Sequence, residues 1–360
     1  GSRPRDEHDR VIIDSEWEIW FRVRTYICTA PEKQRLSSVF PIKKGDHIEL
    51  STILPKYPFR QPEVEFTSQC SVVRVYLDRE LIYSYGEQEE AKNRLVGSGR
   101  MCVPLPGDPY GKELTITLDV CENGMFTRVS EVYIQDTKYY IQNILRDNIW
   151  LLGVALLILA IGIVLLSIAL IMTVMSNYKT RSVIYLSGFA ISTAVWLLCY
   201  SGIALCVTDD YYFLSIATYI CLYIQPIWFG LFASEHIGDE IRRNILRVCA
   251  AVIGLFNIIS WLLNAFNIVH FPGTLKCYHV LMLTDYVVCV VCVCMELYKN
   301  KSRELQSILC GICLYICFVF ADTVFYLIDK YTMPSIVIQE AIMPAGILIL
   351  VISMVFSSVI

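Results

Sequence analysis

Four polar residues interrupt the long apolar runs in the second part of this sequence. Three of them are acids, and the four positions are Asp285, Asp322, Glu340 and Gln225. An ionisable group inside hydrocarbon is costly unless it faces a partner or a water-filled space, so such residues are functional candidates. One interpretation is a polar cavity that opens outward and binds a cation, a proton or a small ligand. The other is that these side chains bond to tyrosines, serines and backbone groups and hold the helices together.

A second candidate site is aromatic and lies in the first part of the sequence. Its residues are Tyr57, Tyr83 and Tyr85, with Arg60, Arg100 or Asp108 as candidates for a charged partner. Aromatic faces beside a cation at one loop end suit a carbohydrate or an organic anion, so we expect an extracellular small molecule of that kind. The alternative is that these aromatics fill the core of a β-sheet domain, which is their commonest role.

No group of residues suggests catalysis or a metal ion. The five histidines show no H-E-x-x-H spacing. The spacings Cys289-x-x-Cys292 and Cys310-x-x-Cys313 lie in apolar runs, where cysteine is typically a small apolar residue. We therefore predict no catalytic residue, metal ligand or cofactor in this chain. A net charge of −4 gives no reason to expect a nucleic acid partner.

Composition predicts a membrane protein with a separate polar domain in front of it. Hydrophobic residues make up 55% of the chain and charged residues 18%, and the charges concentrate in residues 1–148. A bilayer core of about 30 Å needs roughly 20 apolar residues per helix. Runs of that length predict seven transmembrane helices, at about 149–175, 183–206, 212–234, 245–267, 277–297, 306–327 and 335–358.

Basic residues predict how these helices are oriented. Alternate short loops carry eight lysines and arginines: Lys179, Arg181, Arg242, Arg243, Arg247, Lys299, Lys301 and Arg303. The opposite loops carry only Lys276 and Lys330. Because basic loops stay in the cytoplasm, we expect a multi-pass protein of the cell membrane, with the lipid bilayer as its surroundings. Residues 1–148 would lie outside the cytoplasm and the end of the last span inside.

The domain at 17–140 is predicted to be all-β. In LTITLDV (114–120) apolar and polar residues alternate, as they do in SVVRVYLD (71–78). About eight short strands separated by turn signals favour a sandwich or jelly roll. Residues 1–16 are expected to be a linker, in which Gly1-Ser2 resembles a cloning scar. Cys28, Cys70, Cys102 and Cys121 lie in this domain; they either form disulfides of undecided connectivity or are buried free thiols.

Several stretches resemble one bacterial receptor family. VYLDRELIYSYG (75–86) and MCVPLPGDPYGKELTITL (101–118) resemble the outer domain of the seven-transmembrane receptors with diverse intracellular signalling modules. YLSGFAISTAVWLL (185–198), QPIWFGLFASEHIG (225–238) and FADTVFYLIDKY (320–331) resemble their membrane part. One departure is Arg79, which stands where the hairpin of this family usually has glycine, so a turn with positive φ would be strained there.

This resemblance implies a function as well as a fold. The family has a jelly roll, then seven helices, then a cytoplasmic output domain, so the output domain is expected beyond Ile360. The resemblance points most often to a GGDEF diguanylate cyclase, which makes cyclic di-GMP from two GTP molecules with Mg²⁺. Because such a cyclase site forms between two GGDEF domains, the working unit is expected to be a homodimer. The alternative is a seven-helix transporter or channel, or a partner-coupled receptor, with no enzymatic domain.

Overall fold

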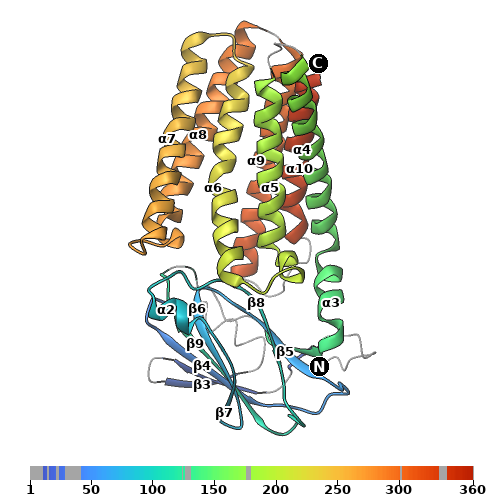
Figure 1. Ribbon diagram of the computed structural model, residues 1–360, viewed down its shortest axis with the longest axis vertical. Coiled ribbons are helices and arrows are strands. Elements are labelled where there is room, and N and C mark those ends of the chain that lie inside the picture. Colours follow the sequence, from blue (N-terminus) through green and yellow to red (C-terminus); the bar gives the residue numbers. More distant parts are fainter. Residues whose placement is uncertain are drawn as a thin grey trace. The chain divides into compact units, whose positions relative to one another are not determined.

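A computed structural model of the chain divides into two compact units (Figure 1). It describes residues 11–13, 16–21, 24–28, 42–123, 125, 131–175, 180–300, 302–331 and 339–359. The first unit comprises residues 1–147 together with two later segments, Ala204–Ile216 and Leu263–Gly273. The second unit comprises Asn148–Ile203, Ala217–Leu262 and Thr274–Ile360. The two units are described separately below.

Two antiparallel sheets form the first unit, as expected for a β-sandwich. The six-stranded sheet has the order β3-β2-β4-β9-β6-β7, with strands at Arg24–Cys28, Trp17–Phe21, His47–Ile53, Glu113–Val120, Ser71–Leu77 and Glu80–Tyr85. The four-stranded sheet has the order β1-β10-β5-β8, with strands at Val11–Ile12, Tyr133–Asp136, Pro62–Ser68 and Gly99–Pro104. Strand alternation buries Val73, Val75, Leu114, Ile116 and Leu118 in the core.

The run EIWFRVRTYI (18–27) predicts one short strand, but it forms a hairpin. The sequence from Glu18 to Ile27 contains no glycine, proline, asparagine or aspartate that would signal a turn. The chain nevertheless reverses between Phe21 and Arg24, which are register partners, so β2 and β3 lie antiparallel. The prediction of one strand here was wrong because no turn-forming residue separates the two arms in the sequence.

The hairpin between β6 and β7 has positive φ at both central residues. Asp78 has φ 49° and Arg79 has φ 67°, and Leu77 and Glu80 close the turn as register partners. Left-handed backbone suits the right-handed twist of the two strands but strains a residue with a Cβ atom. The Asp78 side chain compensates in part by accepting a hydrogen bond from the Glu113 backbone N–H at 2.9 Å.

Replacing Arg79 by glycine is expected to raise the free energy of unfolding by about 0.5–1 kcal/mol, because glycine adopts positive φ without strain. The measurement is the thermal midpoint of the purified protein. Lys92→Gly is the matched control, since Lys92 has φ −92° and gains nothing from the missing Cβ. An Arg79→Gly protein no more stable than the parent would show that the turn is unstrained.

A short helix, α3 at Tyr140–Asp147, ends the N-terminal segment of the first unit and was not expected from the sequence. It follows β10 after a single 3₁₀ turn at Thr137–Tyr139. Its two buried side chains, Asn143 and Ile144, are adjacent in sequence, and one of them is polar. A buried asparagine needs hydrogen-bond partners, which are described below.

The second unit is helical, and a helix overlaps each of the seven predicted segments, whereas the crossing of a membrane by all seven stays a prediction. These helices are α4 (Ile149–Met175), α5 (Arg181–Tyr200), α6 (Tyr211–Glu235), α7 (Glu240–Ala265), α8 (Phe271–Lys299), α9 (Arg303–Tyr331) and α10 (Gln339–Val359). Within the unit α4 packs on α5, and α9 packs on α10. Residues 201–206, which were predicted to continue the second span, instead form a turn and a 3₁₀ helix at Ile203–Cys206.

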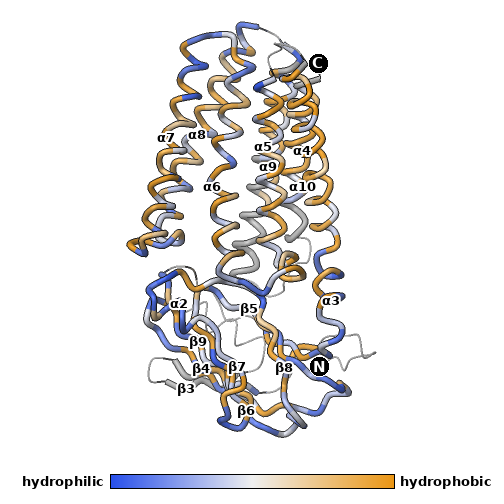
Figure 2. The backbone as a smooth tube through the Cα atoms, in the orientation of Figure 1, coloured by the Kyte–Doolittle hydropathy of each residue, from blue (hydrophilic) through white to orange (hydrophobic). Residues whose placement is uncertain are grey.

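Five of these helices, α4 to α8, are long and apolar enough to cross a membrane. The described parts of α9 and α10 include shorter apolar stretches at Leu305–Tyr315 and Pro344–Ser357. Figure 2 shows α4 and α7 coloured as hydrophobic along most of their length. Their outer faces expose large apolar side chains, among them Leu156, Val164, Leu255 and Ile258. A helix that is apolar on every face is typical of contact with lipid.

Candidate functional site

The predicted aromatic residues lie on different elements of the first unit. Tyr57 and Arg60 are in the connection from β4 to β5, where the Tyr57 ring lies 6.2 Å from that of Phe59. Tyr83 and Tyr85 are on β7, at one edge of the six-stranded sheet. The Tyr83 hydroxyl approaches the Met101 sulfur at 3.8 Å, and Tyr85 packs edge to face on Tyr211 at 5.1 Å. A carbohydrate or anion site at these residues therefore stays a prediction.

Sequence reasoning missed a buried polar layer on the outer face of the four-stranded sheet. Glu63 and Glu65 alternate on β5, and both are only 2% exposed. The Gln135 side chain, on β10, donates from Nε2 to Glu63 Oε1 at 2.8 Å and to Glu65 Oε2 at 3.0 Å. One amide therefore joins two desolvated carboxylates. Burial raises the pKa of Glu63 above its ordinary value.

Helix α3 covers this polar layer and bonds to it. Asn143 donates from Nδ2 to Gln135 Oε1 at 2.7 Å, so the glutamine is satisfied at both ends. Arg100, on β8, lies 3.3 Å from Glu65 and 3.5 Å from Asp147 at the end of α3. The network thus attaches α3, which immediately precedes α4 in the chain, to three strands of the sheet.

The Ala204–Ile216 segment is held in the first unit by close backbone contacts. The Tyr211 hydroxyl donates to the Arg100 carbonyl at 3.0 Å, and Ser98 N–H donates to Ser215 Oγ at 2.9 Å. Gly97 is essential for this approach, because a Cβ atom there would lie 2.4 Å from the carbonyl of Tyr211. Real Cβ atoms do not approach backbone so closely, so a larger residue at this position would displace the segment. Tyr211 is also the first residue of α6.

The Leu263–Gly273 segment is held by a largely buried ion pair. Nδ1 of His270 bonds to the Glu122 carboxylate, and its Nε2 lies 3.0 Å from the Asn93 carbonyl. The Asn93 side chain in turn donates to the Asn267 carbonyl at 2.9 Å. The hydrogen bond to Glu122 raises the pKa of His270 against the opposing effect of burial. The attachment is therefore favoured by the charged imidazolium and weakens as the pH rises through the raised His270 pKa.

Three of the four cysteines in the predicted sandwich domain, residues 17–140, are free thiols: Cys70, Cys102 and Cys121. Burial raises the pKa of Cys70 to about 12 and that of Cys121 to about 11. A thiol so desolvated is a poor nucleophile at neutral pH. Cys28 lies in β3, and its side chain is outside the described residues.

In the second unit, the predicted intramembrane residues fall into two groups. Asp285 is at the middle of α8 and is buried at 2% exposure, and Gln225 on α6 is also buried. Asp322 lies in α9 and Glu340 in α10, but their side chains are outside the described residues. Whether all four line one cavity therefore stays a prediction.

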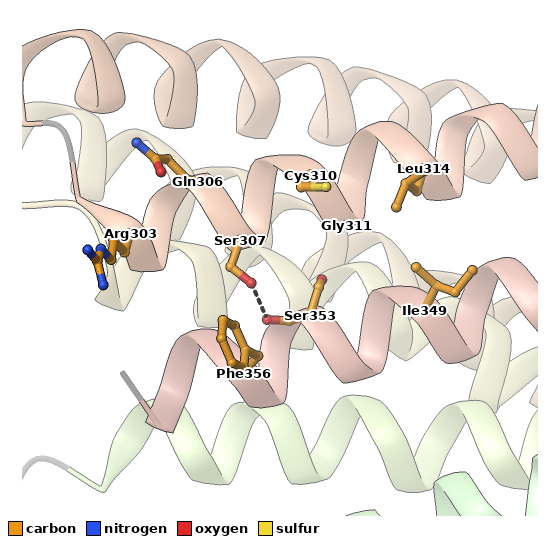
Figure 3. Close-up of a pocket in the computed structure, with 9 residues that line it drawn as sticks. All are labelled: Arg303, Gln306, Ser307, Cys310, Gly311, Leu314, Ile349, Ser353 and Phe356. Carbon is orange, nitrogen blue, oxygen red and sulfur yellow. Dashed lines mark hydrogen bonds between the residues drawn. The ribbon is translucent and has the colours of Figure 1, made fainter.

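A groove between α9 and α10 contains none of the predicted site residues (Figure 3). Its volume is about 500 Å³, and it is lined by Arg303, Gln306, Ser307, Cys310, Gly311, Leu314, Ile349, Ser353 and Phe356. The two helices meet closely at Gly311, where a Cβ atom would lie 1.8 Å from Ser353 Oγ. The Ser307 hydroxyl donates to the Ser353 carbonyl at 3.1 Å, which fixes the pairing of the helices.

No protein-family model matches this chain, and a comparison with curated proteins finds no match.

Proposed function

We propose that this chain is the sensing and transmembrane part of a signal receptor in the cell membrane. In this proposal a jelly-roll sandwich faces the outside, seven helices cross the bilayer, and a cytoplasmic output domain follows the last helix. The single observation that carries it is the content of the first unit. That unit holds, besides the sandwich, the start of α6 and the connection from α7 to α8, through the hydrogen bonds of Tyr211, Ser98 and His270.

These attachments supply a physical route for a signal. Helices are stiff along their axes, so a displacement of Tyr211 or His270 is passed on into α6, α7 or α8. In the same way, the hydrogen bonds of Gln135 pass a displacement of the sheet to α3, which leads into α4. A ligand bound by the sandwich acts only through its different affinities for two arrangements of these attachments.

We further propose that the output is a GGDEF diguanylate cyclase, with GTP and Mg²⁺ at the cyclase, and that the working unit is a homodimer. The resemblance of the sequence to the receptor family supports both points. The basic loops support the orientation, with the sandwich outside the cytoplasm. The signal is an unidentified extracellular small molecule.

A transporter is the second candidate, because the buried carboxylate of Asp285 in the second unit has no hydrogen-bond partner among the described residues. Transporters commonly bind substrate at helices that are broken in mid-membrane. In this chain each of the helices α4 to α8 is continuous, and the proline within α6, Pro226, does not interrupt that helix. The receptor is therefore the function that the attachments support better.

The test joins residues 1–360 to a diguanylate cyclase domain and measures cyclic di-GMP in cells. Gly97→Ala is expected to change the output severalfold, because the new Cβ atom displaces the start of α6. Gly153→Ala is the matched control, since a Cβ atom there meets nothing within 4 Å. If Gly97→Ala reaches the membrane in the same amount and leaves cyclic di-GMP unchanged, the proposed relay is wrong.

A further inference from the structure

Asp285 is enclosed by three helices of the second unit. It lies on α8, and a Cβ atom built on Gly230 of α6 would be 3.6 Å and 3.7 Å from its two carboxyl oxygens. The same point is 3.7 Å from the Cβ atom of Ala250 on α7. The carboxyl group of Asp285 therefore faces the backbone of α6 at Gly230, and Ala250 of α7 borders the same point.

Neither carboxyl oxygen of Asp285 has a hydrogen-bond partner among the described residues. A second acid on the same helix shows what a satisfied buried carboxylate looks like. Glu296 is equally buried, at 2% exposure, yet it accepts hydrogen bonds from Arg242 at 2.6 Å and from Asn300 at 2.8 Å. The contrast between the two acids indicates that Asp285 is not stabilised as an anion.

An unpaired carboxylate in such surroundings is strongly disfavoured, whereas the neutral acid is far less so. We propose that Asp285 is a proton-binding site in the core of α6, α7 and α8, which holds a proton while this packing is intact and releases it when the helices separate. The step is a simple protonation, in which the carboxylate takes a proton from water and no other bond changes.

The groups that surround Asp285 favour a proton over a metal ion. The titratable neighbours that interact with it are the thiols of Cys249 on α7 and Cys289 on α8 and the phenols of Tyr278 and Tyr286 on α8. None of them is a cation, and α6 approaches the carboxyl group at Gly230, which has no side chain. Among the described residues, no three of His, Cys, Asp and Glu gather to hold a metal ion. One carboxyl group among neutral neighbours is enough for a proton but not for an ion that needs several oxygen ligands.

Further polar side chains lie on the same three helices, between Asp285 and the start of α8. The Tyr223 and Thr274 hydroxyls lie 3.0 Å apart, and Asn257 donates to the Tyr223 carbonyl at 2.7 Å. Nε2 of Gln225 and Oδ1 of Asn257 are buried without partners among the described residues. Tyr223 precedes Gly230 by seven residues, a rise of about 10 Å along α6. These groups offer hydrogen-bonding positions for a water molecule or a proton on the side of the carboxyl group toward the start of α8.

The experiment measures thermal midpoints of the whole chain in detergent, from about pH 4 to about pH 9. Asp285→Asn mimics the protonated acid and cannot ionise. The parent protein is expected to lose stability relative to this variant as the pH rises, because the folded state binds a proton that the unfolded state has released. Glu80→Gln, which removes an exposed carboxylate on β7, should follow the parent at every pH.

Infrared spectroscopy gives a readout that does not depend on stability. The carbonyl band of a protonated carboxylic acid should be present in the parent protein at neutral pH and absent from Asp285→Asn. Because that variant could fail to fold, Gly230→Ala is the second variant. Its methyl group meets the carboxyl oxygens at ordinary contact distance. By excluding water it should keep the band to higher pH than in the parent.

Two results would overturn the proposal. One is a constant difference in midpoint between the parent and Asp285→Asn at all pH values, together with no acid band in the parent. The other is a parent protein that is stabilised by sodium chloride but not by choline chloride at equal ionic strength and pH, with that response lost in Asp285→Asn. The second result would identify a metal cation as the occupant.

Discussion

Replacing Gln135 by leucine is expected to lower the free energy of unfolding at neutral pH by about 3–5 kcal/mol. Leucine fills a similar volume but removes the amide that donates to both Glu63 and Glu65. Glu65 keeps the guanidinium of Arg100 at 3.3 Å, whereas Glu63 loses its bond to Gln135. Asn143 also loses the acceptor that ties α3 to the sheet. Thermal or chemical unfolding of the purified chain measures the loss.

The loss should depend on pH in a defined direction. The pKa of Glu63 is already raised by burial above its ordinary value of 4.5, and the variant removes a hydrogen bond that opposes this shift. A buried acid of raised pKa stabilises the fold below its ordinary pKa, and that contribution is lost as the pH rises. The difference between parent and Gln135→Leu should therefore shrink toward about pH 4.5 and grow at neutral pH.

Gln61→Leu is the matched control for this prediction. Gln61 is exposed and directly precedes β5, and its contacts with Asp136 and Thr137 use its own backbone atoms, which the substitution keeps. Its effect should lie within about 0.5 kcal/mol. A Gln135→Leu protein as stable as the control at neutral pH would mean that water or a rearranged side chain satisfies the two carboxylates.

Replacing Arg242 by alanine should also lower the free energy of unfolding by about 3–5 kcal/mol, because it leaves a buried carboxylate of the second unit without its cation. The guanidinium lies 2.6 Å from Glu296 and joins α7 to α8. The Glu296 side chain is 3% exposed and that of Arg242 is 15% exposed. Without the arginine, Glu296 keeps the Asn300 amide, at 2.8 Å, and the Asp239 backbone as hydrogen-bond partners but loses the guanidinium. The measurement is reversible unfolding in mixed detergent and lipid.

The same helix offers a control and a rescue for this ion pair. Arg247 lies 2.8 Å from Glu235, but its side chain is 38% exposed, so Arg247→Ala should cost only about 0.2–1 kcal/mol. Adding Glu296→Gln to Arg242→Ala removes the stranded charge and should restore most of the lost stability. If the two single arginine variants are equally stable, burial of Glu296 does not set the strength of its ion pair.

The sequence predicted some elements well because their signals are local. The run from Ile149 to Met175 contains no charge, and the helix α4 has the same bounds as the predicted span. The alternation in LTITLDV likewise predicted β9, which buries Leu114, Ile116 and Leu118. Local periodicity carries such information because hydrocarbon and a sandwich core each select apolar residues at a fixed spacing. The hairpin of β2 and β3 was missed because its turn carries no such signal.

The sequence alone determined that long apolar helices follow a β-rich domain, and that Asp285 and Gln225 interrupt those helices. Only the tertiary structure decided which polar groups have partners. The alternation of Glu63 and Glu65 on β5 is typical of a solvent-facing strand, yet α3 covers both acids. Asp285 and Glu296 are both acids of α8, yet among the described residues Glu296 meets an arginine and Asp285 meets no hydrogen-bond partner. Hydrogen bonds and desolvation depend on neighbours that are distant in the chain, which the spacing of residues in sequence does not specify.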